Sequence, residues 1–413
     1  MQKKTISVIG LGYIGLPTAA MFAAHNVNVI GVDVSTKAVD AINRGSIHIV
    51  EPGLESVVKK AVNKGLLKAV LTPEPADAFL LAVPTPFNEN HEPDLSYIKS
   101  AVDSISPVLT AGNIVILEST SPVGATEMMA KWIAKARPDL KIAGIEYDGE
   151  PNIHIAHCPE RVLPGKVMEE LITNDRIIGG MTAKCTAMAE QIYKVFVKGD
   201  CIATNCQTAE MAKLTENAFR DVNIAFANEL SLICDKLNIN VWELISLANR
   251  HPRVNILNPG PGVGGHCIAV DPWFIVHSAP DQAKLIKQAR LTNDSKPDYV
   301  VSSVLNAVSH SEKSTVLCMG LAFKADIDDL RESPAVDIVE KLTEFDHLDL
   351  LVVEPNITEL PVSLRNKVTL TTLDESISTA DLLVVLVDHA EFKAISKHDL
   401  KGKPCIDTRG VFN

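Results

Sequence analysis

Residues 5–15 read Thr-Ile-Ser-Val-Ile-Gly-Leu-Gly-Tyr-Ile-Gly, and this stretch decides the fold of the amino-terminal part of the chain. Its β-branched start predicts a buried strand, and residues 16–24 after it predict a helix. A second strand is predicted over 27–32, and Asp33 stands directly after it. Strand, glycine turn, helix, strand and acidic residue in this order predict a dinucleotide-binding βαβ unit. A merely structural glycine turn is the weaker alternative.

The glycine turn predicts how the dinucleotide is held. Gly10 allows the tight turn, Gly12 lets the backbone approach a pyrophosphate, and Gly15 lets helix and strand pack closely. The amino terminus of the helix offers N–H donors to the phosphates. Asp33 is placed to accept hydrogen bonds from the adenosine ribose and to repel a 2′-phosphate, so we expect NAD rather than NADP. The residues expected to contact NAD here are Gly10, Gly12, Tyr13, Ile14, Gly15 and Asp33.

Three further buried strands are predicted in this part of the chain, and polar residues follow each of them. They are expected over 78–83, 113–117 and 153–157. Ligands of open α/β sheets lie beyond the carboxyl ends of the strands, so Thr85 and Thr120 are expected near the nicotinamide half of the cofactor. Thr85-Pro86 and Ser121-Pro122 also fit helix starts, and both interpretations can hold.

The third of these strands is followed by Cys158-Pro-Glu160-Arg161. Taken alone, Glu160 and Arg161 in a proline-bracketed loop are expected to form a surface ion pair.

A long helix is predicted from Thr208 to about Leu237, because the apolar periodicity continues without proline or glycine. At roughly thirty residues it is longer than a helix within one domain usually is. We expect it to link two domains and to carry a dimer interface. Lys213 and Asn217 share one face of it and can donate to the same ligand oxygen, although a solvated polar stripe is an equal alternative. Arg250 and Arg253, farther along the chain, are candidate anion binders.

Residues 259–273 read Pro-Gly-Pro-Gly-Val-Gly-Gly-His-Cys-Ile-Ala-Val-Asp-Pro-Trp. The glycines predict a shaped loop in which backbone and ligand approach closely, Gly264 among them. Cys267 lies four residues before Asp271. An ordinary buried thiol is the usual interpretation of a lone cysteine, and the rest of the chain weighs against it.

From about Ser314 the alternation of strands and helices returns. Strands are expected over 315–321, 349–353, 368–371, 382–387 and 404–407. This predicts a second Rossmann-like sheet that lacks the full glycine fingerprint. Ser333-Pro334 fits the start of a helix. Lys324 and Arg331 flank the first crossover, where a nucleotide phosphate would dock, and Arg suits bidentate phosphate contacts.

The predicted fold class is α/β, with two Rossmann-like, doubly wound parallel sheets joined by a long central helix and a small helical region. The expected domains are an NAD-binding domain at 1–200, a central helical, dimerisation and cysteine-carrying region at 201–297, and a second Rossmann-like, nucleotide-binding domain at 298–413, to which the family resemblance given below assigns a UDP-sugar.

Composition limits the partners and the location. The 413 residues carry a formal net charge of −12, which argues against nucleic acid or an anionic membrane as partner but leaves room for a small anionic ligand. The eight cysteines include no Cys-x-x-Cys pair, which predicts reduced thiols rather than a disulfide framework or a zinc site. With no signal peptide and no apolar run long enough to span a bilayer, we expect a soluble cytoplasmic protein without a metal.

The motifs of this chain resemble, together and in order, those of the NAD-dependent UDP-glucose/GDP-mannose 6-dehydrogenase family, and the resemblance runs over essentially the whole length. They are the glycine turn, Val83-Pro-Thr-Pro86, Glu118-Ser-Thr120, Pro159-Glu160-Arg161, Lys213-x3-Asn217, Gly264-Gly-His-Cys267-x3-Asp271 and Phe323-Lys324…Arg331-Glu-Ser-Pro334. The cysteine loop is the most specific of them.

The resemblance implies a four-electron oxidation of a primary alcohol to a carboxylate with two NAD. Cys267 would trap the intermediate aldehyde as a thiohemiacetal and then carry a thioester, which water hydrolyses. Lys213 and Asn217 would stabilise the oxyanions. Glu160 would handle the proton of the hydrolytic water, while Thr120 and Asp271 order that water or act as the base; which residue is the base stays open.

The resemblance also implies a pyrimidine nucleotide on the carboxyl-terminal domain. Lys324 would lie near the diphosphate or the sugar, and Arg331 would reach towards the cofactor. Arg250 or Arg253 would reach a substrate bound in the neighbouring subunit of a homodimer. The residues expected to contact the substrate are Glu160, Arg161, Lys213, Asn217, Arg250, Arg253, Gly264 and Lys324.

Within the family, the cysteine loop and the segments 158–165 and 249–255 most resemble the bacterial branch that oxidises UDP-N-acetyl-D-mannosamine for surface polysaccharides such as enterobacterial common antigen. The UDP-glucose branch has a lysine directly before the aspartate of this loop, where this chain has Val270, which argues against UDP-glucose. Three alternatives stay open: the gluco epimer UDP-N-acetylglucosamine, a two-electron hydroxyacid-type dehydrogenase with a structural Cys267, and an inactive nucleotide-binding protein.

Overall fold

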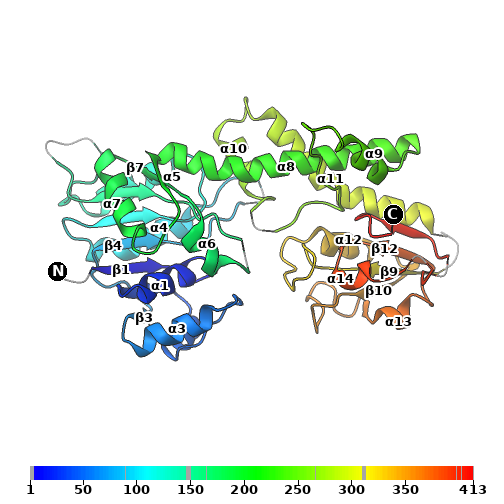
Figure 1. The fold of residues 1–413 in the computed structure, drawn as a ribbon, viewed down its shortest axis with the longest axis horizontal. Coiled ribbons are helices and arrows are strands. Elements are labelled where there is room, and N and C mark those ends of the chain that lie inside the picture. The colour runs from blue at the N-terminus through cyan, green and yellow to red at the C-terminus, as the bar shows by residue number, and fades with distance from the viewer. Residues whose placement is uncertain are drawn as a thin grey trace. The chain divides into compact units, whose positions relative to one another are not determined.

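The computed structural model describes residues 4–88, 90–145, 150–163, 165–265, 267–308, 313–396, 398–400 and 402–412. The chain divides into two compact units, Met1–Thr215 and Glu216–Asn413. In each unit, helices lie on both sides of a central sheet (Figure 1). The long helix α8 (Cys206–Leu237) is continuous and supplies residues to both units. It confirms the helix predicted from about residue 208 to 237.

The amino-terminal unit is built on an eight-stranded sheet with the order β3-β2-β1-β4-β5-β6-β7-β8. Its strands are β1 (Thr5–Ile9), β2 (Asn28–Val32), β3 (Leu67–Val70), β4 (Ala78–Leu81), β5 (Ile114–Leu117), β6 (His154–His157), β7 (Arg176–Gly180) and β8 (Cys201–Asn205). The first six are parallel, in the 3-2-1-4-5-6 order of dinucleotide-binding sheets. The predicted doubly wound parallel sheet is confirmed, with one addition: β7 is antiparallel to β6.

Alternation along β1 sends its side chains to two separate cores, because successive residues of a strand point to opposite faces. Ile6 and Val8 pack in one core with α1, α3 and α7, and Ile9 packs in the other with α4 and α5. The helices of this unit are α1 (Gly15–Ala24), α2 (Thr36–Asn43), α3 (Leu54–Asn63), α4 (Ser96–Ile105), α5 (Ala125–Ala136), α6 (Val167–Thr173) and α7 (Ala183–Tyr193), with a 3-10 turn, η1, at Ser106–Val108. A sheet covered on both faces explains why its strands read as continuous apolar runs.

The carboxyl-terminal unit contains a five-stranded parallel sheet with the order β11-β10-β9-β12-β13. Its strands are β9 (Ser314–Met319), β10 (Leu348–Val353), β11 (Thr369–Leu370), β12 (Leu382–Val385) and β13 (Cys405–Asp407). Its further helices are α9 (Val241–Ala248), α10 (Asp271–Ser278), α11 (Lys284–Ala307), α12 (Pro334–Leu342), α13 (Leu373–Ser376) and α14 (Ala390–Lys393). The predicted second Rossmann-like sheet is confirmed. The predicted helix start is confirmed too, because Ser333 caps α12 and accepts the Ala335 N–H at 3.2 Å.

The turn after β9 in the second sheet is built like the turn after β1 in the first, but with different residues. Gly320 follows β9 with φ +97°, as Gly10 follows β1 with φ +88°. After β10, Glu354 accepts the N–H of Leu321 at 2.7 Å and that of Ala322 at 2.9 Å. Burial opposes ionisation of Glu354, but hydrogen bonds from His389 and these N–H groups outweigh it and lower its pKa to about 2. An ionised carboxylate therefore fixes this turn without a full glycine fingerprint.

The predicted helix starts at Thr85-Pro86 and Ser121-Pro122 are wrong. The helices nearest to them begin only at Ser96 and at Ala125. The start of α5 is capped from far along the chain: the fully buried Glu210 of α8 accepts the N–H of Gly124 at 2.7 Å and that of Thr126 at 2.8 Å. A cap that comes from a residue 84 positions away leaves no local signal.

We expect Glu210→Ala to lower the free energy of unfolding by about 1–3 kcal/mol, because it leaves buried N–H groups of Gly124 and Thr126 without their acceptor. Urea unfolding followed by circular dichroism measures this. The matched control is Glu229→Ala, at an exposed position of the same helix. An equal loss of unfolding free energy in the two variants would show that Glu210 is not the cap.

Candidate functional site

The glycine turn after β1 combines two closely packed glycines with one that faces open space. A Cβ on Gly10 would lie 2.4 Å from the carbonyl oxygen of Ala82, and one on Gly15 would lie 1.8 Å from that of Gly10. A Cβ on Gly12 would meet no atom within 4 Å among the described residues. Gly10 and Gly15 are therefore required by the fold, whereas Gly12 leaves room for a ligand.

The start of α1 suits an anion. Ile14 stands at its N-cap and supplies no side-chain acceptor to the first turn, which contains no acidic residue. The N–H groups of that turn and the positive end of the helix dipole therefore point at the space in front of Gly12, as a diphosphate requires. The residues present fit a dinucleotide.

Asp33 organises the same turn. One carboxylate oxygen accepts the N–H of Leu11 at 2.9 Å, and the other accepts that of Ser35 at 2.8 Å. Each oxygen keeps a lone pair for a ribose hydroxyl. Tyr13, inside the turn, is 43% exposed and so is accessible to a ligand.

The polar segments that follow β4 and β5 are joined by hydrogen bonds. The hydroxyl of Thr85 donates to the carbonyl oxygen of Thr120 at 2.5 Å, and the N–H of Val83 donates to the hydroxyl oxygen of Ser119 at 2.9 Å. The structure thus joins the two threonines that the sequence placed at this edge of the sheet.

Glu160 pairs with a residue that the sequence did not suggest. Its carboxylate binds the guanidinium of Arg176 on β7 at 2.7 Å, with both side chains almost fully buried. Its other oxygen accepts the backbone N–H of Arg161 at 2.7 Å. The guanidinium of Arg161 donates instead to the carbonyl oxygen of Asp175 at 3.3 Å. The expected surface pair between Glu160 and Arg161 is wrong, because a buried arginine from the neighbouring strand is the stronger partner.

Arg176 lies at the centre of a buried polar cluster. Its guanidinium lies 4.5 Å from the ring centroid of Tyr193 and 3.7 Å from the sulfur of Cys158. The hydroxyl of Tyr193 donates to Glu118 at 2.6 Å. Burial raises the pKa of Glu118 to about 7, even though the charge of Arg176 opposes the shift.

The cysteine loop of the carboxyl-terminal unit brings three predicted residues together. Cys267 is exposed, whereas the other seven cysteines are buried or half-buried. The amide of Asn217 on α8 donates to the carboxylate of Asp271 at 2.6 Å, and both side chains are buried. The N–H of Asp271 in turn donates to the carbonyl oxygen of Cys267 at 2.9 Å. His266, like Pro164 in segment 158–165, lies outside the described residues.

The glycines of this loop let it lie against the segment between β9 and α12. A Cβ on Gly264 would lie 2.4 Å from the carbonyl oxygen of Glu332, and one on Gly265 would lie 3.0 Å from the ring of Phe323. The segment that meets the loop therefore includes the exposed Lys324 and Arg331, and Arg331 is paired with Asp329 at 2.6 Å. Loop and segment are in contact, as a shared nucleotide-sugar site would require.

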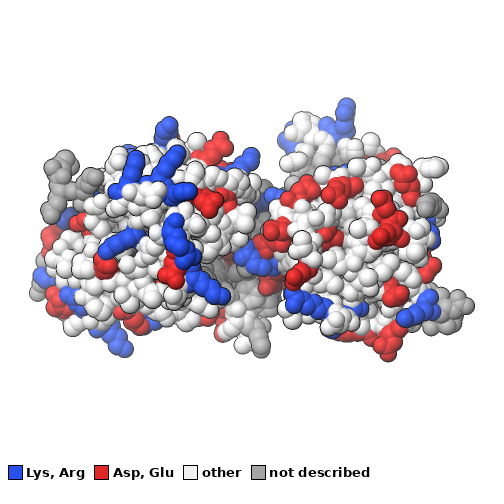
Figure 2. Space-filling view, turned by 90° about the horizontal axis from the view of Figure 1, so that it is seen from below, with Lys and Arg blue, Asp and Glu red and all other residues white. Residues whose placement is uncertain are grey.

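The remaining predicted residues lie apart from these contacts. Lys213, half-buried, is one turn before Asn217 on α8, and Arg250 and Arg253 are exposed after α9. On the face shown in Figure 2, Lys and Arg are numerous on the amino-terminal unit, whereas Asp and Glu predominate on the carboxyl-terminal unit.

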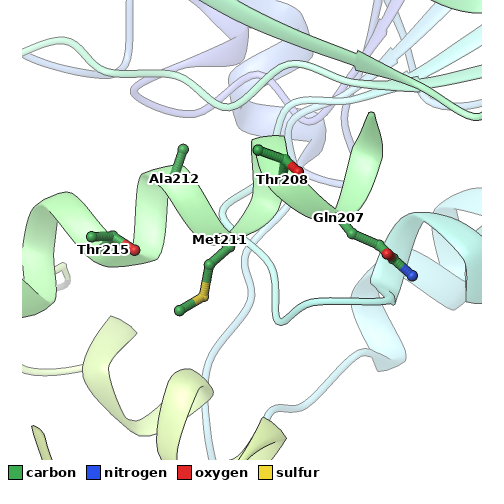
Figure 3. A pocket seen from close by; sticks show the side chains of 5 residues that line it. All are labelled: Gln207, Thr208, Met211, Ala212 and Thr215. Atoms are coloured by element: carbon green, nitrogen blue, oxygen red, sulfur yellow. The ribbon is translucent and has the colours of Figure 1, made fainter. Parts of the chain in front are cut away.

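A shallow hollow on α8 is not the site. It is lined by Gln207, Thr208, Met211, Ala212 and Thr215. All five come from one helix, and Gln207 and Met211 project from the same side of it (Figure 3). The hollow contains no ionisable residue, and it lies on an exposed helix surface.

Three domain models of one protein family match successive parts of this chain. Residues 4–197 match the NAD-binding domain of the UDP-glucose/GDP-mannose dehydrogenase family, 207–295 its central domain and 317–413 its UDP-binding domain. The chain belongs to the UDP-glucose/GDP-mannose dehydrogenase family. The predicted family, the predicted cofactor NAD and the predicted class of NAD-dependent UDP-sugar dehydrogenase are confirmed.

Three relatives show how far the similarity extends. The UDP-N-acetyl-D-mannosamine dehydrogenase of Yersinia pestis is 61% identical over the whole of both chains. The NDP-N-acetyl-D-galactosaminuronic acid dehydrogenase of Ralstonia nicotianae is 58% identical, over 99% of this chain and 96% of its own. The solved UDP-N-acetyl-mannosamine dehydrogenase of Staphylococcus aureus is 43% identical, with a TM-score of 0.85 over 99% of this chain and 95% of its own.

In the described ranges, none of the helices is long and apolar enough to cross a membrane. The same ranges contain no cluster of three or more His, Cys, Asp or Glu side chains suited to a metal ion.

We expect Gly12→Ala to weaken NAD binding without unfolding the protein, because its Cβ would occupy the open space where the diphosphate approaches. Gly15→Ala, the matched comparison, would collide with the carbonyl oxygen of Gly10 and destabilise the unit itself. Calorimetric titration with NAD and thermal unfolding separate the two. Unchanged NAD affinity in Gly12→Ala would contradict the assignment of this turn.

Proposed function

We propose that this protein oxidises the C6 alcohol of UDP-N-acetyl-D-mannosamine to the carboxylate of UDP-N-acetyl-D-mannosaminuronate, with two NAD. The observation that carries the proposal is the exposed Cys267 held next to the buried Asn217–Asp271 pair, in a chain 61% identical to a relative of that name. Product of this kind would serve a surface polysaccharide such as enterobacterial common antigen.

Cys267 explains how one site completes two oxidations. Its thiolate attacks the aldehyde carbon, so the intermediate stays covalently bound as a thiohemiacetal. Oxidation of that adduct leaves a thioester, which water cleaves to the carboxylate and the free thiol. NAD, when bound, accepts the hydride in each oxidation. The glycine turn, α1 and Asp33 hold its diphosphate and ribose, with Thr85, Thr120 and Arg331 near the rest of the cofactor.

Asn217 and Lys213 stabilise the negative oxygen of the tetrahedral adducts. An amide carries two N–H donors, and Asn217 uses one of them on Asp271. That bond fixes the direction of the other, which is the preorganisation an oxyanion site requires. Lys213, one turn earlier on α8, adds a positive charge.

Glu160 manages the proton of the hydrolytic water, together with Thr120 and Asp271. Its carboxylate is held from both sides, by Arg176 at 2.7 Å and by the N–H of Arg161 at 2.7 Å. The rigid placement of a carboxylate favours proton transfer at one position. Asp271, buried beside Asn217, orders the water or acts as the base itself.

The uridine diphosphate sugar binds to the cysteine loop and the segment between β9 and α12. Gly264 allows the close contact with that segment, and Lys324 binds the diphosphate or the sugar. Arg161 contributes a further substrate contact. Arg250 or Arg253 reaches the substrate of a neighbouring subunit, for which the exposure of both is suitable.

We also propose a homodimer formed through α8. Large apolar side chains are exposed along this helix at intervals of four, seven or eight residues, which places them on one face. They are Met211, Phe219, Phe226, Ile233 and Leu237, exposed by 38% to 68%. Such a stripe is typical of an interface. The eight free cysteines fit a reducing compartment, so we propose a cytoplasmic location.

The substrate is tested by counting NADH formed per sugar consumed. We expect two NADH with UDP-N-acetylmannosamine, and little turnover with UDP-N-acetylglucosamine, UDP-N-acetylgalactosamine, UDP-glucose or GDP-mannose. Two NADH with another of these sugars would keep the thioester route and change the substrate. One NADH with any of them would contradict the function assigned to the cysteine loop.

The dimer is tested by the double variant Phe219→Glu with Phe226→Glu, which places two charges on the apolar stripe. We expect it to be a monomer by light scattering after size exclusion, whereas the unaltered chain is a dimer. Tyr97→Glu is the control, because Tyr97 is an exposed aromatic residue on α4, away from this stripe. A double variant that remains dimeric would place the interface elsewhere.

A further inference from the structure

Helix α8 holds the cysteine loop at both ends. At the far end, the amide of Asn217 donates to Asp271 at 2.6 Å. At the near end, the backbone N–H of Gly260 donates to the amide oxygen of Asn228 at 2.8 Å. Asn217 and Asn228 are eleven positions apart, which is about three helical turns, so they share one face of α8. The loop that carries Cys267 is thus tied to one helix at two points.

The hydrogen bond between Asn228 and Gly260 is fully buried, and both polar atoms of the Asn228 side chain have a partner. Asn228 has no exposed surface, and Gly260 is buried beneath Arg409. The amide nitrogen of Asn228 donates to the side-chain oxygen of Asn293 on α11 at 2.8 Å. Both polar atoms of the amide therefore have protein partners, and the tie does not depend on solvent.

A relay of buried groups fixes the orientation of that amide. Asp221 on α8 only accepts hydrogen bonds when ionised, and it is held by Arg290 at 2.5 Å. The amide nitrogen of Asn293 must therefore face Asp221, which it does at 2.8 Å, and its oxygen must face Asn228. Asn228 can then present only its oxygen to Gly260. The ion pair of Arg290 and Asp221 thus determines that the side-chain oxygen of Asn228 faces Gly260.

A side chain at position 260 would displace the guanidinium of Arg409. A Cβ there would lie 2.6 Å from a guanidinium nitrogen of Arg409, which is itself held by Asp388 at 2.6 Å. Gly260, the second residue of the loop, is thus held between Asn228 and Arg409. Beyond it, Gly262 and Gly265 have φ of +150° and +83°, a backbone conformation that residues with a Cβ rarely adopt.

We propose that Asn228 is a positioning residue for Cys267, which it serves by fixing the start of the cysteine loop through Gly260 while Asn217 fixes the end. This inference rests on the function proposed for Cys267. A nucleophile that stays bonded through two oxidations and a hydrolysis has to keep one position, and the glycines of the loop do not provide it. Displacement of a reacting group by about 1 Å costs roughly 100-fold in rate.

The test is Asn228→Leu, which keeps the size of the side chain and removes both hydrogen bonds. Its matched control is Ser231→Ala, three positions along the same face of α8. Ser231 is also buried and bonds Lys296 of α11 at 2.9 Å, but its side chain does not bond the cysteine loop. If Asn228→Leu is insoluble, Asn228→Ser replaces it, because serine is too short to reach Gly260 and leaves space for water.

Two readouts are compared after thermal unfolding has shown how much each variant loses in stability. Hydrogen exchange of the peptide spanning 259–273 is expected to quicken in the Asn228 variant and not in Ser231→Ala. The kcat is expected to fall roughly 10- to 100-fold in the Asn228 variant. The KM values for NAD and the sugar nucleotide should stay within about threefold, since neither ligand contacts Asn228. Ser231→Ala should keep its kcat within about twofold.

Unchanged exchange of the loop, or faster exchange with unchanged kcat, would overturn the inference. So would a fall in kcat that simply follows the loss of stability in both variants. Failure of the proposed function appears differently: the unaltered protein would not form two NADH per sugar, while the exchange of the loop would still respond to Asn228.

Discussion

The hydrogen bond between Asn217 and Asp271 is the interaction on which the rest of this structure depends. It joins the long helix to the loop that carries the exposed cysteine, and it is buried, so neither partner can turn to water without cost. It also commits one N–H of the amide and thereby directs the other. Through this bond, α8 positions the end of the loop that carries Cys267.

Helix α8 performs this role because its polar residues face inwards. Asp221, Asn228 and Ser231 are buried and pair with Arg290, Asn293 and Lys296 of α11. Apolar side chains such as Phe219 and Phe226 are exposed instead. Burial lowers the pKa of Lys296 to about 8, although Asp235 opposes the shift, so this interface is costly to form.

Much of the fold was predictable from local sequence. Most strands of the two sheets, the glycine turn and the length of α8 follow from periodicity and glycine spacing, which are local signals. Helix α11 was not predicted, because Arg290, Asn293 and Lys296 are buried in it and Pro297 lies within it, so it shows no apolar stripe. The strands β3, β7 and β8 were missed as well. The side chains of β8 are partly or fully exposed, so it shows no apolar run.

The residues of the candidate site also fall into two groups, those that sequence motifs reveal and those that only their contacts reveal. Residues proposed to bind or to react, such as Cys267, Asp33 and Asn217, stand out in the sequence because they lie in short motifs. Arg176 and Asn228 do not, because their partners lie 16 and 32 positions away and their importance arises only from contact. An arginine inside the strand Arg-Ile-Ile-Gly-Gly was the one available signal for the first of them. No comparable signal marks Asn228, which is one of several polar residues on a long helix.

The central claim is that Cys267 carries the substrate as a thioester. The most direct measurement is rapid acid quenching of the enzyme during turnover of UDP-N-acetylmannosamine with NAD, followed by digestion and mass spectrometry. If Cys267 carries the thioester, the mass of the substrate acyl group appears on the peptide that contains Cys267. Cys267→Ser then shows neither that adduct nor formation of the uronate. Steady formation of the uronate by Cys267→Ser at nearly the unaltered rate would contradict the claim.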